Sequence, residues 1–467
     1  MLGSDAINAI LFFCILSTTL FAFTSYIVFV IFRVPIYHII AIYMLYHFVG
    51  FVVRPWELYY EGFSLQWDYI GTVPSSGDIL WTAIVVVLSH ASMLAGFLIV
   101  NGKSQTPLIQ PFAFRPDRRL AFLAVTLLAL LLGAYGLTKQ HGDVLSLDRV
   151  NAAEVSVDSM GGQRLDNVSG YQLMLADFVP VTIIILFATR RLRIVAILLL
   201  VAFVAYGSLA GSTRSAFIAT LLAVGCIGLI ETRRRFPPIK VVAAAIVVLA
   251  LFNVLGSDRM AIRRIVNGEV TISDIVDNYF NNDTRGGAPI AGDMQEFDVL
   301  TAVLKVVPAR SGYTYGTQYI RLLVWPIPRQ LWADKPVFTS IVNLMNYANF
   351  EYLTTTLYAD TYITIGIFGL IPMLVLISML LNYLYAKVIS SRQSLWIMIY
   401  ICTVMYSPII FRDGPVSAAY FILVASLGAT TILYCGRVRN AVALGRPRAW
   451  RESLAVGPAS LPLRRFS

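Results

Sequence analysis

The residues best suited to chemistry lie in one short stretch, RLLVWPIPRQLWADKP, at positions 321–336. It holds Arg321, Arg329 and Lys335 beside two tryptophans and three prolines. The prolines lack a backbone donor, so a helix that begins near Tyr319 cannot continue through them. Guanidinium groups held on such a rigid backbone match phosphate oxygens with paired hydrogen bonds. The stretch therefore predicts a site for an anionic lipid headgroup, above all a lipid diphosphate.

Other cations and aromatic rings accompany this stretch along the chain. Arg214 lies in the turn GSTRS (211–215), and Arg259 and Arg310 follow further on, so we expect these three to support the diphosphate site. Candidates for stacking on sugar faces are Tyr313, Tyr315 and Trp332, with anchoring at the membrane interface as the alternative. The ordinary alternative for the cations is pairing with carboxylates of the same region, namely Asp274, Asp277, Asp283, Asp293, Glu296 and Asp298.

Composition places these residues in a membrane protein. Of 467 residues, 58% are hydrophobic and 13% are charged, with mean hydropathy +0.72, whereas a soluble domain has about 25% charged residues. Apolar runs long enough to cross a ~30 Å hydrocarbon core recur along the chain, and lipid requires them to be helical. We predict an all-α polytopic membrane protein with about eleven spans, at 6–32, 36–53, 79–100, 119–138, 172–189, 194–210, 215–230, 241–255, 357–386, 394–411 and 415–435.

The charges of the predicted loops indicate the orientation. One set of loops is rich in arginine and lysine and holds only the acids Asp117, Glu231 and Glu452, while the other set holds nearly every other carboxylate. Because positive loops stay in the cytoplasm, the N-terminus is expected outside and the C-terminus inside. The net charge of +10 then follows from topology and requires no nucleic-acid partner.

Four parts follow from this topology. They are an N-terminal bundle of about eight spans at 1–255, a long exoplasmic loop at 256–356, C-terminal spans at 357–435 and a basic cytoplasmic tail at 436–467. The loop of about a hundred residues is far longer than ordinary connections, and such loops are often functional. Within it, 319–331 is apolar but too short to span, which is typical of a re-entrant or interfacial segment.

The sequence gives little indication of a metal, a cofactor or a path through the spans. It contains no HExxH or CxxC pattern, and its four cysteines lie in or beside apolar runs. The main ionisable groups in the span interiors are Asp177, His38, His47 and His90. We expect the histidines to be hydrogen-bonded packing residues between helices.

Three motifs resemble a known family: GSTR at 211–214, IPRQLWADKP at 327–336 and IGIFGL at 365–370. Together with the spans and the long late loop, they resemble the Wzy-type polymerases of oligosaccharide repeat units, which make bacterial O-antigen, capsule and exopolysaccharide. The resemblance covers about residues 211–381. The R-x10-G pattern of some members is absent from the outside loops, where 305–316 is the nearest match and begins with lysine.

This resemblance implies a GT-C-like, metal-independent glycosyltransferase of the bacterial inner membrane. Such enzymes pass a growing glycan from undecaprenyl diphosphate to the sugar of a lipid-linked repeat unit at the periplasmic face. Periplasmic arginines are a theme of the family, and Arg214, Arg321 and Arg329 are the positions here that match its motifs. Implied partners are the lipid-linked glycans, membrane lipids, a chain-length-determining copolymerase and a flippase.

A reaction of this kind needs cations for the departing diphosphate and a base for the acceptor hydroxyl. The six cations named above are expected to serve the diphosphate. Candidate bases near the outer membrane boundary are Asp258, Glu351 and Asp360.

Two other functions stay open from the sequence. An O-antigen ligase would share the donor and differ in the acceptor, although the PRxxWxxKP pattern and a single outside histidine, His141, favour a polymerase. A polysaccharide exporter or flippase would require polar residues along a path through the spans.

We predict that Arg321→Ala or Arg329→Ala abolishes polymer while leaving membrane insertion intact, because a neutral side chain cannot bind phosphate oxygens. Lysine at either position should restore polymer only in part, since it lacks the planar fork of arginine. Gel separation of surface polysaccharide checks this. Long-chain polymer at the wild-type level in both alanine variants would contradict the assignment.

Overall fold

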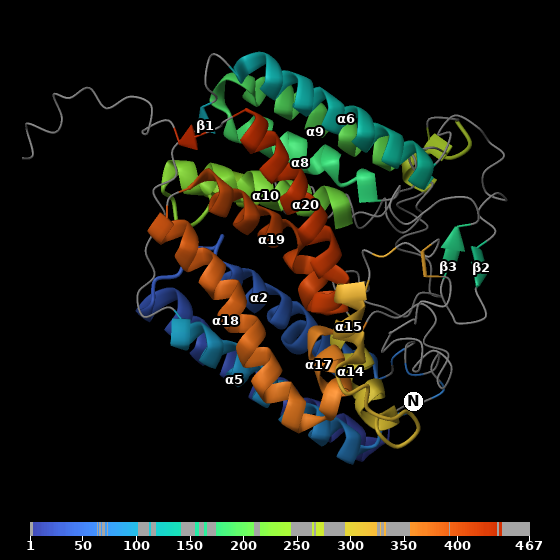
Figure 1. Ribbon diagram of the computed structural model, residues 1–467. Coiled ribbons are helices and arrows are strands. Elements are labelled where there is room, and N and C mark those ends of the chain that lie inside the picture. The colour runs from blue at the N-terminus through green and yellow to red at the C-terminus, as the bar shows by residue number, and fades with distance from the viewer. Residues whose placement is uncertain are drawn as a thin grey trace, which may run out of the picture.

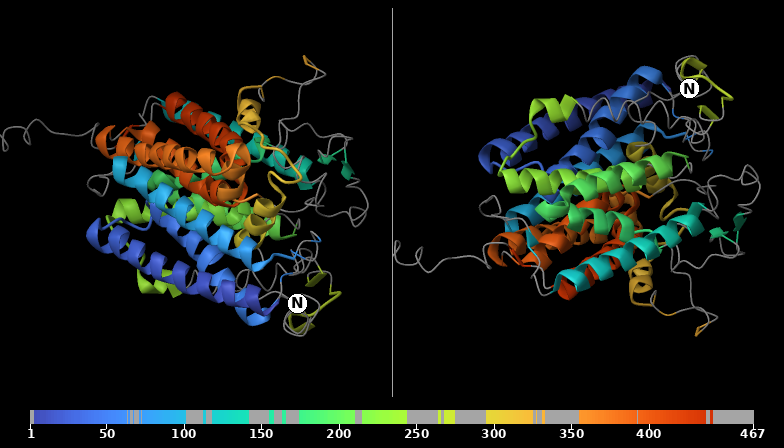
Figure 2. Two further views of the ribbon diagram at one scale, coloured as in Figure 1. Left: turned by 90° about the horizontal axis from the view of Figure 1, so that it is seen from below. Right: turned by 90° about the horizontal axis from the view of Figure 1, so that it is seen from above.

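The long helices lie side by side, and their ends gather at two opposite ends of one bundle in the computed structural model (Figure 1, Figure 2). The structure describes residues 3–62, 64, 67, 71, 73–100, 112–113, 118–141, 155–157, 163–165, 174–209, 215–243, 264–265, 268–274, 295–324, 327, 331–332, 355–391, 393–436 and 439–440. The N-terminus lies at one end, which we call the loop end. The opposite end, where β1 lies, is called the tail end.

Within these ranges, seven helices are long and apolar enough to cross a membrane. This finding confirms a helical, multi-pass membrane protein. They are Ser4–Ile31 (α1 Ser4–Ser25 and the π-helical Tyr26–Ile31), Ile39–Glu61 (α2 Ile39–Phe48, the π-helical segment η2 Val49–Val53 and α3 Arg54–Glu61), Ser76–Val100 (α5), Arg119–Thr138 (within α6 Arg119–His141), Ile367–Ser391 (α18), Ser394–Asp413 (α19) and Ala418–Cys435 (within α20 Pro415–Cys435).

Three more apolar helices lie where further spans are predicted. They are α8 (Phe178–Ala188), α9 (Arg193–Leu209) and α10 (Ser215–Thr232), which are 11, 17 and 18 residues long. The predicted span 241–255 lies mostly outside the described residues. Among the described residues the strands are short: β1 (Phe112–Ala113) pairs with β4 (Arg439–Asn440), and β2 (Val155–Val157) pairs with β3 (Gln163–Leu165).

Contacts at the tail end join connections that are far apart in sequence. The Arg193 guanidinium binds the Glu231 carboxylate at 2.6 Å. The backbone N–H of Ile36 donates to the carbonyl of Arg235 at 3.0 Å, and the β1–β4 pair joins the loop before α6 to the tail. The connections at 33–38, 190–193 and 232–240, each of which carries arginine, therefore meet at one end of the bundle, as their predicted alternation requires.

Helices from the two halves of the chain pack together, most closely where α5 meets α18. The Ser378 hydroxyl on α18 donates to the carbonyl of Met93 on α5 at 2.5 Å. A Cβ placed on Gly96 would lie 2.5 Å from the carbonyl oxygen of Val375. Absence of a side chain at this position lets the two backbones approach, which is the usual mode of helix association in lipid.

The single predicted span 357–386 is wrong, because the chain breaks at Gly366. This residue has φ +67°, a backbone conformation that favours glycine. The break separates the buried short helix α17 (Leu357–Ile365) from α18.

The long loop also differs from a simple surface excursion. Its helix α14 (Glu296–Val306) is buried along most of its length, and the Phe297 ring stacks on Phe13 of α1 at 4.9 Å. Helix α15 (Thr317–Val324) ends two residues before Pro326, as the prolines predict.

We predict that Gly96→Ala lowers the free energy of unfolding by about 1–3 kcal/mol, because the new methyl group meets the α18 backbone. Gly225→Ala is the matched control, since a Cβ on this α10 glycine meets nothing within 4 Å. Thermal unfolding of the purified protein in detergent should show a lower midpoint for the first variant only. Equal midpoints for both variants would contradict the close approach.

Candidate functional site

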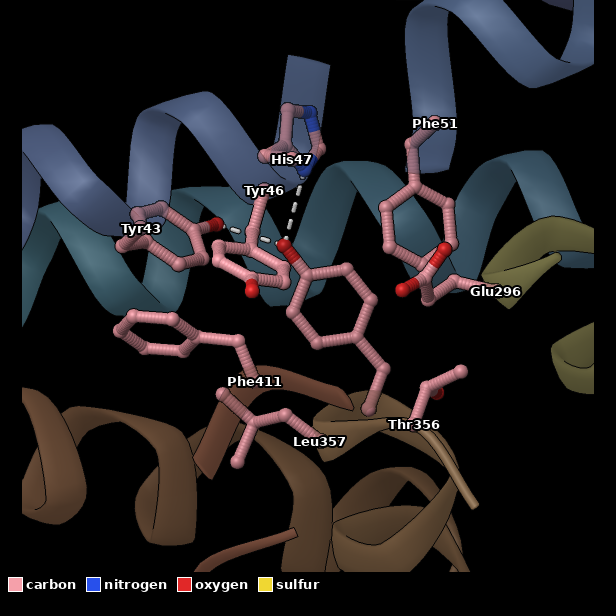
Figure 3. Close-up of a pocket in the computed structure, with 9 residues that line it drawn as sticks. Tyr43, Tyr46, His47, Phe51, Glu296, Thr356, Leu357 and Phe411 are labelled. Atoms are coloured by element: carbon pink, nitrogen blue, oxygen red, sulfur yellow. Dashed lines mark hydrogen bonds between the residues drawn. The ribbon is translucent and has the colours of Figure 1, made fainter. Parts of the chain in front are cut away.

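A small hollow lies between α2, η2, α14, α17 and α19, and its free volume of about 20 Å³ is room for about one water molecule (Figure 3). Its walls are mainly aromatic, and one carboxylate enters it. The lining residues are Tyr43, Tyr46, His47, Phe51, Glu296, Thr356, Leu357, Tyr358 and Phe411. A space of this size can admit a single hydroxyl group or a water molecule beside the carboxylate.

Helix α14 brings its first residue deep into the bundle. At its far end the Lys305 ammonium lies 3.3 Å from the Asp78 carboxylate, near the start of α5. One turn back along α14, the Thr301 hydroxyl contacts that of Thr82 at 3.2 Å. Because α5 enters the bundle from the loop end, residues of α14 lie deeper toward its start, and Glu296 is the deepest.

The Glu296 carboxylate is buried and without a close partner. The residue is 5% exposed, and neither carboxylate oxygen hydrogen-bonds to another described residue. Figure 3 shows the side chain reaching from α14 into the hollow beside Phe51. Its position at the start of a helix favours a negative charge.

Burial raises the pKa of Glu296 to about 7 because a charged carboxylate loses its hydration there. The backbone N–H of Glu296 and the Arg412 guanidinium lower this pKa, and the Asp298 and Asp413 carboxylates raise it. The group is therefore poised between its neutral and charged forms near neutral pH.

A glycine in a distorted turn makes room for this carboxylate. Gly50 lies in the π-helical segment η2, and a Cβ at this position would lie 2.8 Å from Glu296 Oε2 and 3.1 Å from its Cδ. π-Helical turns inside α-helices are frequent at functional sites. The glycine in η2 thus leaves space for the Glu296 carboxylate.

A row of hydrogen bonds crosses the bundle beside the hollow. The Tyr358 hydroxyl lies 3.0 Å from His47 Nδ1 and 2.5 Å from the Tyr43 hydroxyl. Tyr43 in turn contacts His90 Nδ1 at 2.9 Å, and His90 Nε2 contacts the Thr24 hydroxyl at 3.0 Å. The row joins α17 to α2, α5 and α1, and it confirms His47 and His90 as hydrogen-bonded packing residues.

The direction of this row follows from its end. Thr24 donates its one hydroxyl hydrogen to a carbonyl of its own helix at 2.9 Å, so it must accept from His90 Nε2–H. His90 Nδ1 then accepts from Tyr43, Tyr43 accepts from Tyr358, and Tyr358 accepts from His47 Nδ1–H. With this direction, the Tyr43 and Tyr358 hydroxyls each donate one hydrogen bond and accept one, and the row ties the start of α17 to α2.

An ion pair fastens α14 to the second span. The Arg54 guanidinium donates to Asp298 Oδ2 through Nε at 3.0 Å and through Nη2 at 2.9 Å. Both side chains are fully buried, at 1% and 0% exposure. Glu57 and Glu61 approach the same guanidinium at 3.3 and 3.7 Å. Among the described residues, no group of three histidine, cysteine or acidic side chains is arranged to hold a metal ion.

Half of the twelve predicted site residues lie outside the described residues. These are Asp258 and Glu351 among the bases, and Arg214, Arg259, Arg329 and Lys335 among the cations. Arg321 lies in α15, but its side chain is outside the description. Arg310 is exposed and follows α14.

The remaining predicted base, Asp360, is buried on α17 at 4% exposure. The Tyr319 hydroxyl donates to its Oδ2 at 3.4 Å, and a Cβ on Gly414 would lie 2.9 Å from that oxygen. Asp360 therefore fills the junction between α17, α15 and the turn before α20, and it is not among the residues that line the hollow.

Of the three predicted stacking residues, Tyr313 is packed inside the protein, whereas Tyr315 and Trp332 are exposed. The Tyr313 ring packs against Tyr362 at 6.3 Å, and its hydroxyl lies 2.7 Å from where a Cβ of Gly366 would be. Tyr315 is 73% exposed and Trp332 is 38% exposed, so both present ring surface at the loop end.

The carboxylates predicted as partners for loop cations behave differently from one another. Asp298 pairs with a cation of the second span, and Asp274 accepts from the backbone N–H of Thr271 at 2.8 Å. Glu296 makes no ion pair with any described residue.

Comparison of the chain with protein-family models, with curated proteins and with solved structures gives no match.

We predict that Asp298→Ala lowers the free energy of unfolding by about 3–5 kcal/mol, since it leaves a buried guanidinium short of its closest partner. The control is Lys305→Gln, which breaks the partly exposed pair at the other end of α14 and should cost at most about 1 kcal/mol. Thermal unfolding in detergent compares the two. A larger loss for Lys305→Gln would contradict the role of Arg54 and Asp298 as the main anchor of α14.

Proposed function

We propose that this chain is a glycosyltransferase that polymerises lipid-linked oligosaccharide repeat units. It transfers a growing glycan from undecaprenyl diphosphate to the sugar of a lipid-linked repeat unit. The observation that carries the proposal is the hollow at the base of the long loop, with a buried carboxylate that has no hydrogen-bond partner on another described residue. Unpaired ionisable groups in clefts are typical of active sites.

The position of the hollow suits a substrate that is part lipid and part sugar. It lies inside a membrane bundle, yet two of its walls come from α14 and α17, which connect directly to the loop end. A carrier lipid can stay in the bilayer while one hydroxyl of its sugar reaches this small hollow.

Cations for the departing diphosphate come from the loop end in this proposal. Arg412, at the end of α19, is close enough to Glu296 to lower the pKa of that carboxyl. Its guanidinium binds Asp413 at 2.7 Å and is 38% exposed, so it can also meet an anion at the mouth. The motif residues Arg321, Arg329 and Lys335 supply the remaining positive charge, which stabilises the leaving group.

Orientation follows from the distribution of charge. The connections that carry arginine meet at the tail end, so the tail end faces the cytoplasm and the loop end faces the periplasm of a bacterial inner membrane. The reaction then takes place at the periplasmic face. Partners in this setting are the lipid-linked glycans, a flippase that supplies them and a copolymerase that sets chain length.

An exporter or flippase is the second candidate, and the row from Thr24 to His47 is the observation that favours it. Polar groups inside a membrane bundle often mark a substrate or proton path. Here, however, successive members of the row are 2.5–3.0 Å apart and bonded to one another. The row therefore closes the bundle at this level and serves as an interhelical fastening. An O-antigen ligase would use the same hollow with a different acceptor.

We predict that deletion of the gene leaves single unpolymerised repeat units on the carrier lipid and on the cell surface. The reason is that the units are still made and moved across the membrane but no longer joined. Gel separation of lipid-linked and surface glycans measures this. Polymer retained on the carrier lipid would indicate a ligase, and repeat units confined to the cytoplasmic face would indicate a flippase.

A further inference from the structure

We propose that Glu296 is the general base of this site, the group that takes the proton from the acceptor hydroxyl. This inference rests on the proposed function and names a catalytic residue within it. Three features of Glu296 point to this role: its position in the hollow, the lack of partners for its oxygens, and the contrast with the paired carboxylates Asp298 and Asp360.

Place comes first. Glu296 is the one ionised-type carboxylate among the residues that line the hollow, beside the neutral side chains of Tyr43, Tyr46 and His47. The deep end of α14 holds it there, and the glycine at position 50 leaves room for its oxygens. A carboxylate that served only solubility would not need a buried position with space left for it, because any exposed position of the loop would serve.

The state of its oxygens is the second observation. A buried carboxylate normally binds donors, since leaving it unpaired costs free energy. The neighbouring Asp298 binds Arg54 through one of its two oxygens, Oδ2, and Asp360 receives a hydrogen bond from Tyr319. Both Glu296 oxygens, by contrast, face no donor from another described residue. A substrate hydroxyl is the donor that would complete this site, and a carboxylate that meets it can remove its proton.

The chemical step balances without any further reactant. The acceptor O–H bond breaks, and its proton moves to a Glu296 carboxylate oxygen. The acceptor oxygen forms a bond to the anomeric carbon of the donor sugar. The bond from that carbon to the diphosphate oxygen breaks, and the polyprenyl diphosphate leaves with the electron pair. The raised pKa of Glu296, at about 7, suits a base that must accept a proton near neutral pH.

The experiment measures polymer formation by the purified full-length protein on lipid-linked repeat units isolated from a strain that lacks the gene. Glu296→Gln should form polymer at least about 100-fold more slowly than wild type while still binding the repeat unit. Glu269→Gln, which changes an exposed glutamate of the same loop, should match wild type. Glu296→Gln within about threefold of wild type overturns the proposal, as does loss of polymer confined to Asp360→Asn.

A second measurement covers the case in which Glu296→Gln does not fold. The wild-type rate should fall as the pH drops below about 7, because protonation of the carboxylate removes the base. A rate that stays constant from about pH 5.5 to 8.5 overturns the role of Glu296. If wild-type protein forms no polymer at all, the proposed function fails and this inference fails with it. An active wild type with an active Glu296→Gln overturns the inference alone.

Discussion

The burial of polar groups inside a membrane bundle is the constraint on which this structure depends. Lipid offers no hydrogen bonds, so each hydroxyl, imidazole or charge placed between the helices must find a partner within the protein. Arg54 and Asp298 satisfy this demand as an ion pair, and Tyr43 and Tyr358 satisfy it in a row of hydrogen bonds. These contacts hold α14 and α17 against the long helices. The same demand makes an unpaired carboxylate in their midst a departure that calls for a function.

Helices α14 and α17 both begin in the interior of the bundle and end at the loop end. The first residue of α14 and the first residues of α17 line the hollow, while their last residues return to the loop end. Helix N-termini carry partial positive charge, and here two of them border one small space. A negative charge in that space is therefore less costly than its burial alone suggests. This arrangement can stabilise Glu296 when it is ionised without neutralising it through a direct partner.

The long helices could be predicted from the sequence, whereas the two short helices could not. Spans such as 394–411 and 415–435 are apolar runs that lipid forces into helices, and α19 and α20 match them closely. Helix α17 merges with α18 into one apolar run, because a single glycine at 366 is a weak signal for a break. Helix α14 has only 11 residues and carries acids and a lysine, so it reads as part of a polar loop. Its burial depends on partners on α1, α3 and α5.

The candidate site could likewise be predicted from the sequence only in part. A cluster of cations and aromatics near 321–336 is visible in the sequence because residue types alone suggest phosphate binding. The state of Glu296 is not visible there, because it depends on which side chains from distant helices reach it. In the sequence this residue resembles its neighbour Asp298, two positions on, and both look like partners for loop cations. Only the packing of α14 against η2 and α3 separates them, since it places a guanidinium beside one and a glycine beside the other.

The proposed reaction needs cations for the diphosphate and a carboxylate for the acceptor hydroxyl, and these two kinds of group lie at different depths in the bundle. A diphosphate carries its charge at headgroup level, where exposed or motif arginines at the loop end can meet it without a large loss of hydration. A base works best where water is scarce, because a carboxylate stripped of hydration holds a proton more tightly and competes for it with the acceptor hydroxyl. The structure places Arg412 at the end of α19 with 38% exposure and Glu296 within the bundle with 5%. The donor would then present its diphosphate at the outer level, while the acceptor would place its reacting hydroxyl at the inner level.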